Sequence, residues 1–395
     1  MTTVHDYEDF VHTGPGTLAG RYLRMFWHPV SRMKDLKPGQ AKPVQLMSEK
    51  FTLYRGESGK PYLVDFSCAH RGTQLSTGWV EGECIRCRYH GWKYEGSGQC
   101  VEQPGEDGAY ADKVRLKSYP TQEYLGLIFV YIGEGEPPLM RRHPDFEEPG
   151  VLEAGVPEIW PCNYFNRVDN ACDAGHVAFT HREAVSRVEN MQRQLAIRSL
   201  TSEETEYGIR TTNSVPGRDP FYLHFHMPIT NQSRSQARVE GTLEDAARLW
   251  VDRLFWRVPL DDDNCISFVV DRVPLTGEAG EAYRERRRKA EETQTAPLNQ
   301  IAEDILAGKM TLAEVDRSLS TYKLFWIEDY VVQVGQGRGE DRPEEHLGRM
   351  DIGVFLLRKI WQRELKALAD GRPLKQWRTP PGLADMSKLA VPKAS

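Results

Sequence analysis

Cys68-Ala-His70 and Cys87-Arg-Tyr-His90, with sixteen residues between them, form the most diagnostic pattern in this chain. The pattern places two thiolates and two imidazoles on two short segments. This donor set fits a [2Fe–2S] centre in which two Cys bind one iron and two His bind the other, so each segment must supply one Cys and one His. A structural zinc site is the alternative, because Cys84-x-x-Cys87 is also a C-x-x-C pair. We favour the cluster and expect Cys84 to lie on a strand that leads into the second segment.

The two segments resemble the cluster-binding loops of Rieske domains. Respiratory Rieske proteins carry an extra cysteine in each loop, and the two are bridged to one another. Here Tyr89 precedes the histidine of the second loop and Arg71-Gly72-Thr73 follow that of the first, so the bridge is absent. The resemblance is therefore to the Rieske domains of oxygenases. It implies that the cluster is bound by Cys68, His70, Cys87 and His90.

A second candidate metal site lies downstream. The spacing D-x-x-H-x-x-x-x-H at Asp173, His176 and His181 resembles the mononuclear-iron segment of the Rieske non-haem iron oxygenases. Two His and a carboxylate from elsewhere form the facial triad of oxygen-activating Fe(II). On an ideal helix Asp173 and His176 share a face, whereas the two histidines lie about 140° apart. Both reach one iron only if the helix is bent, ended or bulged, and we predict an irregularity around Ala178–Thr180. Ordinary surface histidines on an amphipathic helix are the alternative.

The third ligand is expected to be a carboxylate further along the chain. The segment 322–333 is apolar and aromatic, yet it contains the acid pair Glu328-Asp329. Unpaired charges are costly to bury, and metal binding would offset that cost. Asp329 resembles the carboxylate ligand of the family, so we expect it rather than Glu328 to bind iron. A surface helix with two solvated acids is the alternative. The other acid pair, Glu303-Asp304, lies in what reads as an exposed amphipathic helix.

The expected fold class is α+β, in two domains. Residues 1–138 read as an N-terminal segment and an all-β Rieske domain, with hairpins at 51–65 and 92–101 and a boundary in the Gly- and Pro-containing segment 133–138. Residues 139–395 are expected to form the catalytic domain with the mononuclear iron. By the resemblance this domain is a helix-grip fold, in which a curved antiparallel sheet surrounds a long helix. Within it we expect strands at 222–226 and 266–270, a charged helix at 283–292 and a core-packing stripe along 355–368.

Composition restricts the partners. The net charge of −6 argues against nucleic acid as a partner. The start of the chain lacks signal-peptide features, and the longest strongly apolar run, 125–132, is too short to cross a bilayer. Seven cysteines, an odd number, fit a reducing compartment. We therefore expect a cytoplasmic protein without a membrane or nucleic-acid partner.

The resemblance extends along nearly the whole chain, to the large (alpha) oxygenase component of the phthalate 4,5-dioxygenase and aromatic O-demethylase branch. It implies a terminal oxygenase of aromatic compound catabolism that uses O2 and electrons from an NAD(P)H-dependent reductase or a ferredoxin. The implied reaction is hydroxylation of a small aromatic substrate or oxidative removal of an O- or N-alkyl group. Cis-dihydroxylation of a phthalate-like ring is the alternative. A Rieske electron carrier without oxygenase activity is a remote alternative, because it would leave the downstream pattern unexplained.

The resemblance also implies how the two centres communicate. Asp173 corresponds to a bridging carboxylate that contacts the iron ligand His176 and reaches a cluster histidine, most simply His90, on a neighbouring subunit. A homotrimer with head-to-tail contacts follows, because a cyclic heterologous interface closes a ring. Asp169 is a further candidate catalytic acid. Candidates to line the substrate pocket are Phe165, Asn166, Val177 and Ala178, although purely structural residues would give the same pattern.

Overall fold

Short strands separated by tight turns build the first third of the chain. The computed structural model describes residues 9–106, 108–187, 199–214, 220–237, 249–292, 298–337, 344–380 and 382–383. One four-stranded antiparallel sheet has the order β2-β3-β4-β9 and is built from Ala41–Leu46, Glu49–Arg55, Pro61–Asp65 and Ser118–Tyr119. Within it Phe51 pairs with Asp65 and Arg55 with Pro61, which confirms the predicted hairpin at 51–65.

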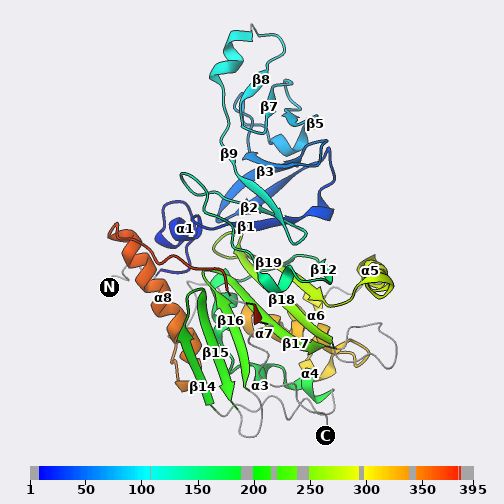
Figure 1. Ribbon diagram of the computed structural model, residues 1–395, viewed down its shortest axis with the longest axis vertical. Coiled ribbons are helices and arrows are strands. Elements are labelled where there is room, and N and C mark those ends of the chain that lie inside the picture. Colours follow the sequence, from blue (N-terminus) through cyan, green and yellow to red (C-terminus); the bar gives the residue numbers. More distant parts are fainter. Residues whose placement is uncertain are drawn as a thin grey trace.

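A second four-stranded sheet forms the far end of the molecule (Figure 1). Its order is β5-β6-β7-β8, and its strands are Trp79–Glu81, Cys84–Arg86, Lys93–Glu95 and Cys100–Glu102. The pairing of β7 with β8 confirms the second predicted hairpin, and Cys84 starts the strand that leads into the second Cys/His loop. A separate core lies beneath this sheet and includes Tyr54, Val64, Leu75, Ile85 and Tyr94.

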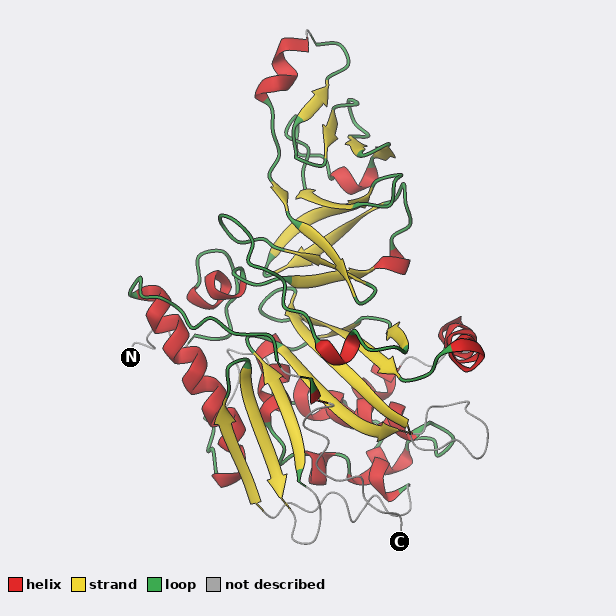
Figure 2. Ribbon diagram, in the orientation of Figure 1, coloured by secondary structure: helices red, strands yellow, loops and turns green. Residues whose placement is uncertain are grey.

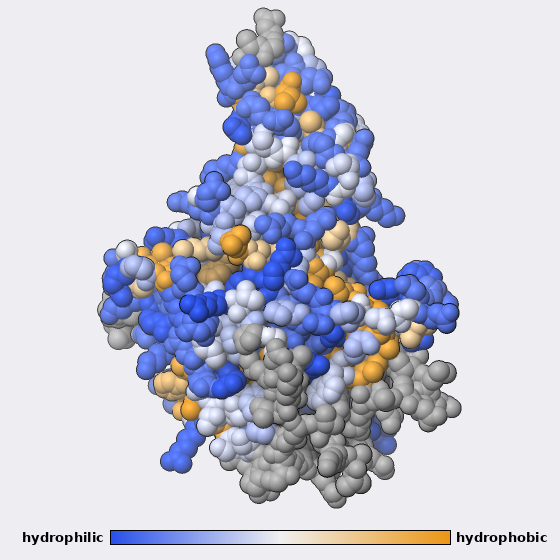
Figure 3. Space-filling view, in the orientation of Figure 1, coloured by the Kyte–Doolittle hydropathy of each residue, from blue (hydrophilic) through white to orange (hydrophobic). Residues whose placement is uncertain are grey.

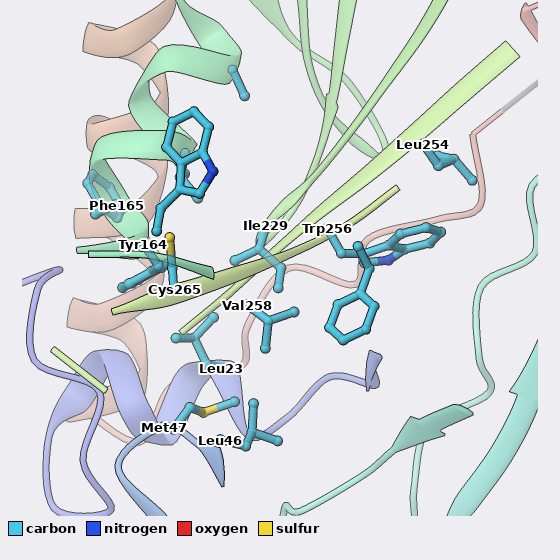
Figure 4. Packing of buried hydrophobic residues seen from close by; sticks show 14 of the residues in the cluster. Leu23, Leu46, Met47, Tyr164, Phe165, Ile229, Leu254, Trp256, Val258 and Cys265 are labelled. Atoms are coloured by element: carbon cyan, nitrogen blue, oxygen red, sulfur yellow. The ribbon is translucent and has the colours of Figure 1, made fainter. Parts of the chain in front are cut away.

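A small sheet and a short helix join this region to the rest of the chain. The sheet has the order β1-β11-β10, from His28–Arg32, Leu127–Val130 and Thr121–Tyr124, and α1 is Leu18–Leu23. Its Phe129 packs edge-on against Trp256 of the second region, with ring centroids 5.5 Å apart. Figure 4 shows Leu23, Leu46 and Met47 packing toward Val258 and Ile229. One hydrophobic core therefore continues from the N-terminal sheets into the second region.

An eight-stranded antiparallel sheet dominates the second region (Figure 2). Its main path is β12-β19-β18-β17-β16-β15-β14, and β13 also pairs with β19. In chain order, β12 to β19 are Val151–Ala154, Glu158–Trp160, Ser199–Glu204, Gly208–Ser214, Phe221–His226, Thr230–Ala237, Leu249–Pro259 and Cys265–Val273. The strands predicted at 222–226 and 266–270 are confirmed. An all-β first part followed by an antiparallel sheet with helices is the expected α+β arrangement.

Helices cover this sheet from behind and from its edge (Figure 2). α2 packs on β16 and β18 and also contacts α7 and α8. The predicted charged helix is confirmed as α5, which carries several Arg–Glu pairs between successive turns. The helices α2 to α8 are Tyr164–Cys172, Val177–Thr180, Arg182–Ser186, Gly277–Glu292, Leu298–Leu306, Thr321–Val334 and Ile352–Ala369.

The stripe predicted along the last helix is only partly correct. Ile360, Trp361 and Leu365 are buried as expected, but Phe355 is 59% exposed. The buried line along α8 starts at Val354 and continues through Leu357, so Phe355 lies one position outside it.

The surface of the molecule is mostly polar. The face shown in Figure 3 is largely hydrophilic, with small apolar areas between charged side chains. Within the part of the chain that the structure describes, none of the helices combines the length and apolarity that crossing a membrane would require.

Candidate metal centres

The two Cys/His loops have the same backbone design. In the first, the amide of Cys68 donates to Thr73 and the amide of Gly72 donates back to Cys68. In the second, Cys87 and Gly91 repeat the pattern with Trp92 in place of Thr73. The two glycines have φ values of +74° and +75°, a conformation that L side chains rarely adopt. Each loop therefore turns back at its glycine and presents its Cys and His to the other loop.

The donor atoms of these loops divide into an inner and an outer pair. Cys68 and Cys87 are buried, at 3% and 2% exposure, whereas His70 and His90 are exposed. The two imidazole rings lie 4.5 Å apart, and Trp92 stacks on His70. A cluster with its Cys-bound iron inside and its His-bound iron at the surface fits this arrangement.

Polar contacts around the buried sulfurs are few. The Tyr94 hydroxyl lies 3.2 Å from Cys68 Sγ. Burial raises the pKa of Cys68, while that hydroxyl lowers it in part. A bound metal would stabilise the thiolate that burial disfavours. Cys84 lies outside both loops, paired across strands with Glu95.

The downstream centre begins where α2 ends. The backbone of Asp173 is extended, and its Oδ1 accepts from the amides of Gly175, at 2.7 Å, and His176, at 3.2 Å. Asp173 thus ends α2 and stabilises the turn that precedes α3. A second break falls at His181, between α3 and α4. The irregularity predicted around Ala178–Thr180 exists, but it falls at the next residue, because Ala178–Thr180 is itself helical.

These breaks bring the predicted triad together. Oδ1 of Asp329, from α7, lies 3.9 Å from His176 Nε2 and 3.5 Å from His181 Nε2. One ligand atom from each of the three residues lies within 4.8 Å of the others. Two donors about 2.1 Å from one metal lie about 3.0 to 4.2 Å apart, depending on the angle between them. Asp329 Oδ1 is buried without a hydrogen-bond partner, an arrangement that a metal ion would satisfy.

Glu328 has a different position from its neighbour. It is fully buried, and its carboxylate accepts from His181 Nδ1, at 3.1 Å, and from the Ala184 amide, at 2.9 Å. A proton held on Nδ1 leaves Nε2 free to bind a metal. Glu328 is therefore a positioning residue that orients His181. The sequence marked it as an acid in an apolar helix but did not identify its partner.

The other histidine lies beside Asp173, whose Oδ2 is 3.5 Å from His176 Nδ1, at ion-pair distance. Burial alone would lower the pKa of His176, but the contact with Asp173 and the charge of Asp329 outweigh it, so that pKa is raised. Burial would likewise raise the pKa of Asp173, but His176 and the capped amides reverse the effect and lower it. Asp173 therefore remains a carboxylate beside the triad.

The candidate catalytic acid and two of the candidate pocket residues make contacts that favour structural roles. Asp169 forms an ion pair with Arg358 of α8, which favours a structural role over a catalytic one. Phe165 stacks on Phe10 and packs edge-on against Trp361, away from the triad. Asn166 donates to the carbonyls of Gln333 and Gly337 at the end of α7. Of the four predicted pocket residues, the two that remain beside the triad, on α3, are Val177 and Ala178.

Comparison with known proteins agrees with this geometry. Residues 26–120 match the family model of the Rieske [2Fe-2S] domain. The chain is 28% identical to the oxygenase subunit of 5,5'-dehydrodivanillate O-demethylase from Sphingobium sp. (strain NBRC 103272 / SYK-6), over 95% of this chain and 83% of that protein. It is 26% identical to the oxygenase subunit of tert-butanol monooxygenase / tert-amyl alcohol desaturase from Aquincola tertiaricarbonis, over 93% and 78%.

A solved structure extends the comparison to the fold. The terminal oxygenase of carbazole 1,9a-dioxygenase from Novosphingobium sp. KA1 superposes with a TM-score of 0.64 at 19% identity, covering 91% of this chain and 95% of that one. None of these similarities singles out the phthalate 4,5-dioxygenase branch, which stays a prediction. The solved structure shows the fold, and the Rieske domain with relatives along nearly the whole length identifies the chain as an oxygenase component of the Rieske non-haem iron type.

Proposed function

We propose that Cys68, His70, Cys87 and His90 hold the [2Fe–2S] cluster of this family, and that its mononuclear iron is held by His176, His181 and Asp329. The first set is supported by two loops of equal design with facing imidazoles. The second is supported by a three-residue donor set with an unpartnered buried carboxylate oxygen. Two His and one carboxylate leave coordination positions open, as an oxygen-activating Fe(II) requires.

The reaction we propose is monooxygenation of a small aromatic compound, either as hydroxylation or as oxidative removal of an alkyl group. The observation that carries it is the triad formed by the two histidines that flank α3 and by Asp329 of α7, because an electron carrier would need no second metal site. Full-length similarity to an O-demethylase subunit favours dealkylation over cis-dihydroxylation. The iron, when bound, supplies O2 activation. The chain supplies the orientation of both histidines, through Glu328 and Asp173.

Electrons are proposed to come from an NAD(P)H-dependent reductase, directly or through a ferredoxin, and to enter at the Cys/His loops. His70, His90 and Tyr89 are exposed at the end of the molecule. An exposed His pair is a suitable entry point because its imidazoles connect the cluster to the surface.

A homotrimer with head-to-tail contacts is proposed because the two centres of one chain lie in different parts of the molecule. The second loop joins β6 to β7 in the sheet at the top of Figure 1, and the first loop, which follows β4, faces it, whereas α3 lies at the bottom. A second copy would bring a cluster histidine to Asp173, whose side chain is 23% exposed. Exposed apolar side chains near this site also favour an interface: Phe179 is 71% exposed, and Met350, 41% exposed, lies beside Gly175.

The experiment is a coupled screen of the holoprotein with a reductase, NADH and O2. Oxygen uptake and product mass are followed for methoxybenzoates, N-alkyl anilides and phthalates. Release of formaldehyde with a product 14 mass units lighter, the loss of one CH2 group, supports dealkylation. A product heavier by two oxygen and two hydrogen atoms supports dihydroxylation instead. Oxygen uptake that no member of the panel stimulates, with both metal sites loaded, contradicts the proposed substrate class.

A further inference from the structure

Two buried arginines lie close to the proposed iron site without an acid partner. Arg257 of β18 is 7% exposed and Arg167 of α2 is 5% exposed. Among the described residues, neither has a carboxylate within ion-pair distance. Arg257 Nε, and Nε and Nη1 of Arg167, are buried without a hydrogen-bond partner. Buried charges are normally paired, so two unpaired guanidinium groups require an explanation.

Arg257 lies on the face of the sheet that α2 covers. Side chains alternate along β18, and Leu254, Trp256 and Val258 take the other face, which packs against the N-terminal part (Figure 4). Arg257 therefore points toward the opposite face, where α2 packs on β18. The charges of Arg167 and Asp329 both act on the pKa of Arg257, which puts its guanidinium group near the proposed iron ligand.

The polar groups around Arg257 have hydrogen-bonding capacity that the described residues do not use. Its Nη1 donates to Asn231 Oδ1 on the neighbouring strand. Ser267, directly across from it on β19, is buried, and its hydroxyl has no partner. Phe255, on the same strand face, lies with its ring centroid 4.8 Å from the guanidinium carbon. These groups offer N–H and O–H donors beside an aromatic ring.

Neither arginine is paired with the acids that lie nearby. Glu158 is close enough to Arg167 to feel its charge, but it accepts from Trp326 Nε1 instead, and Arg167 stacks on Trp160 at 3.4 Å. Asp329 is assigned to the metal. Burial, and then the charge of Arg167, lower the pKa of Arg257 to about 9, so it remains protonated at neutral pH.

Another arginine of the same strand shows the ordinary arrangement. Arg253 lies four residues before Arg257 and on the same face, and it forms a two-pronged ion pair with Asp271 of β19. The corresponding position opposite Arg257 is Ser267. The strand thus supplies a carboxylate to one arginine and only a hydroxyl to the other.

We propose that Arg257 binds the anionic group of the substrate, with Arg167 adding to the positive field, so the substrate is an aromatic carboxylate. This inference rests on the proposed function, because it assumes that the triad marks the reaction site. Arg257 is then a specificity-determining residue. The planar guanidinium suits a carboxylate, which accepts two parallel hydrogen bonds.

The test is equilibrium binding to the oxidised holoprotein, measured by calorimetry without O2 or reductant. The probes are benzoate, 3-methoxybenzoate, 4-methoxybenzoate and phthalate, each paired with its neutral amide. The wild type should bind at least one acid about 10- to 100-fold more tightly than its amide. Arg257→Gln, which can keep a hydrogen bond to Asn231, should lose that preference, and Arg257→Lys should recover part of it.

Arg253→Gln is the matched control, because it removes an arginine of the same strand face that already has its acid. It should leave the acid-to-amide ratio unchanged. The proposal is overturned if no acid binds below about 10 mM, if amides bind as tightly as acids, or if Arg257→Gln keeps the preference. Arg257→Met adds a readout of the buried charge: it should raise the melting temperature without ligand, and the tightest-binding acid should raise that of the wild type alone.

The two proposals fail in different ways. Preference for acids without oxygen uptake contradicts the proposed reaction and leaves the anion site intact. Turnover of a neutral aromatic without any preference for acids contradicts the role of Arg257 and leaves the oxygenase assignment intact.

Discussion

Replacing Glu328 by Gln tests whether a buried carboxylate holds the proposed iron ligand His181 in its metal-binding form. Both oxygens of Glu328 accept hydrogen bonds, one from His181 Nδ1 and one from the Ala184 amide. Gln presents one oxygen and one NH2 group, so one of the two donors then faces another donor. If the NH2 group faces His181, the imidazole proton moves to Nε2, the atom that lies 3.5 Å from Asp329.

The expected loss of iron affinity is taken from metal sites in which a ligating histidine loses its hydrogen-bond partner. Removing the partner of a metal-binding His typically weakens the metal site by about 10- to 100-fold, which is about 1.4 to 2.7 kcal/mol. If Ala184 loses its acceptor instead, the protein is destabilised by about 1 to 3 kcal/mol.

The assay is Fe(II) binding to cluster-loaded protein, with iron competed by a chelator and the cluster followed by its visible absorbance. Glu328→Gln should raise the dissociation constant for the mononuclear iron and leave the cluster spectrum intact. Glu303→Gln, on the exposed side of α6, is the control and should change neither. Unchanged iron affinity together with unchanged unfolding stability in Glu328→Gln would refute the role of this carboxylate.

Three further predictions concern the cluster, acid stability and the link between centres. Cys84→Ser should keep the visible Rieske spectrum, whereas Cys87→Ser should abolish it; equal loss in both would point to a different ligand set. Burial lowers the pKa of His143 to about 3, and that of its neighbour His226 also falls. Their contribution to stability is therefore complete above about pH 6.5 and declines by up to about 1.4 kcal/mol per histidine and pH unit below it. In His143→Gln, the unfolding free energy should fall less steeply with pH between about pH 6.5 and about pH 5 than in the wild type. An unchanged slope would contradict this account. Asp173→Asn should keep cluster absorbance but slow cluster reoxidation in a single turnover with O2 and substrate, and wild-type rates would argue against the bridge.

The candidate metal ligands could be proposed from the sequence because their spacing is mostly local. Each Cys/His loop is five residues long and closes on its own backbone at Gly72 or Gly91. The facial triad needs one distant residue, but Asp329 stands out as a charge within an apolar helix. Residues that are close in sequence stay close in the folded structure, so a local pattern of donors is a good guide to their grouping.

The position of the helix break was harder to predict. Angles on an ideal helix require an irregularity between the two histidines, and they say nothing about where it falls. Asp173-Ala-Gly175 is itself a break signal, because an Asp side chain can cap the following amides and end a helix. The hydrogen bonds from the Gly175 and His176 amides to Asp173 therefore explain why α2 ends here.

Contacts between distant parts of the chain could not be predicted from the sequence. Glu328 meets His181 across 147 residues, and Asp169 meets Arg358 across 189. Arg257 appears in the sequence as one charge in a strand, like Arg253, and only the register of β19 shows that one faces an acid and the other a serine. Such partners depend on strand register and helix packing, which one sequence does not fix.

The most direct measurement of the central claim is iron per chain, in the wild type and in Asp329→Ala. An oxygenase component with both centres should hold about three irons per chain, two in the cluster and one in the triad. Asp329→Ala should fall to about two irons per chain with its Rieske spectrum unchanged. A fully loaded wild type with about two irons, or an Asp329→Ala variant that keeps about three, would contradict the assignment of the triad.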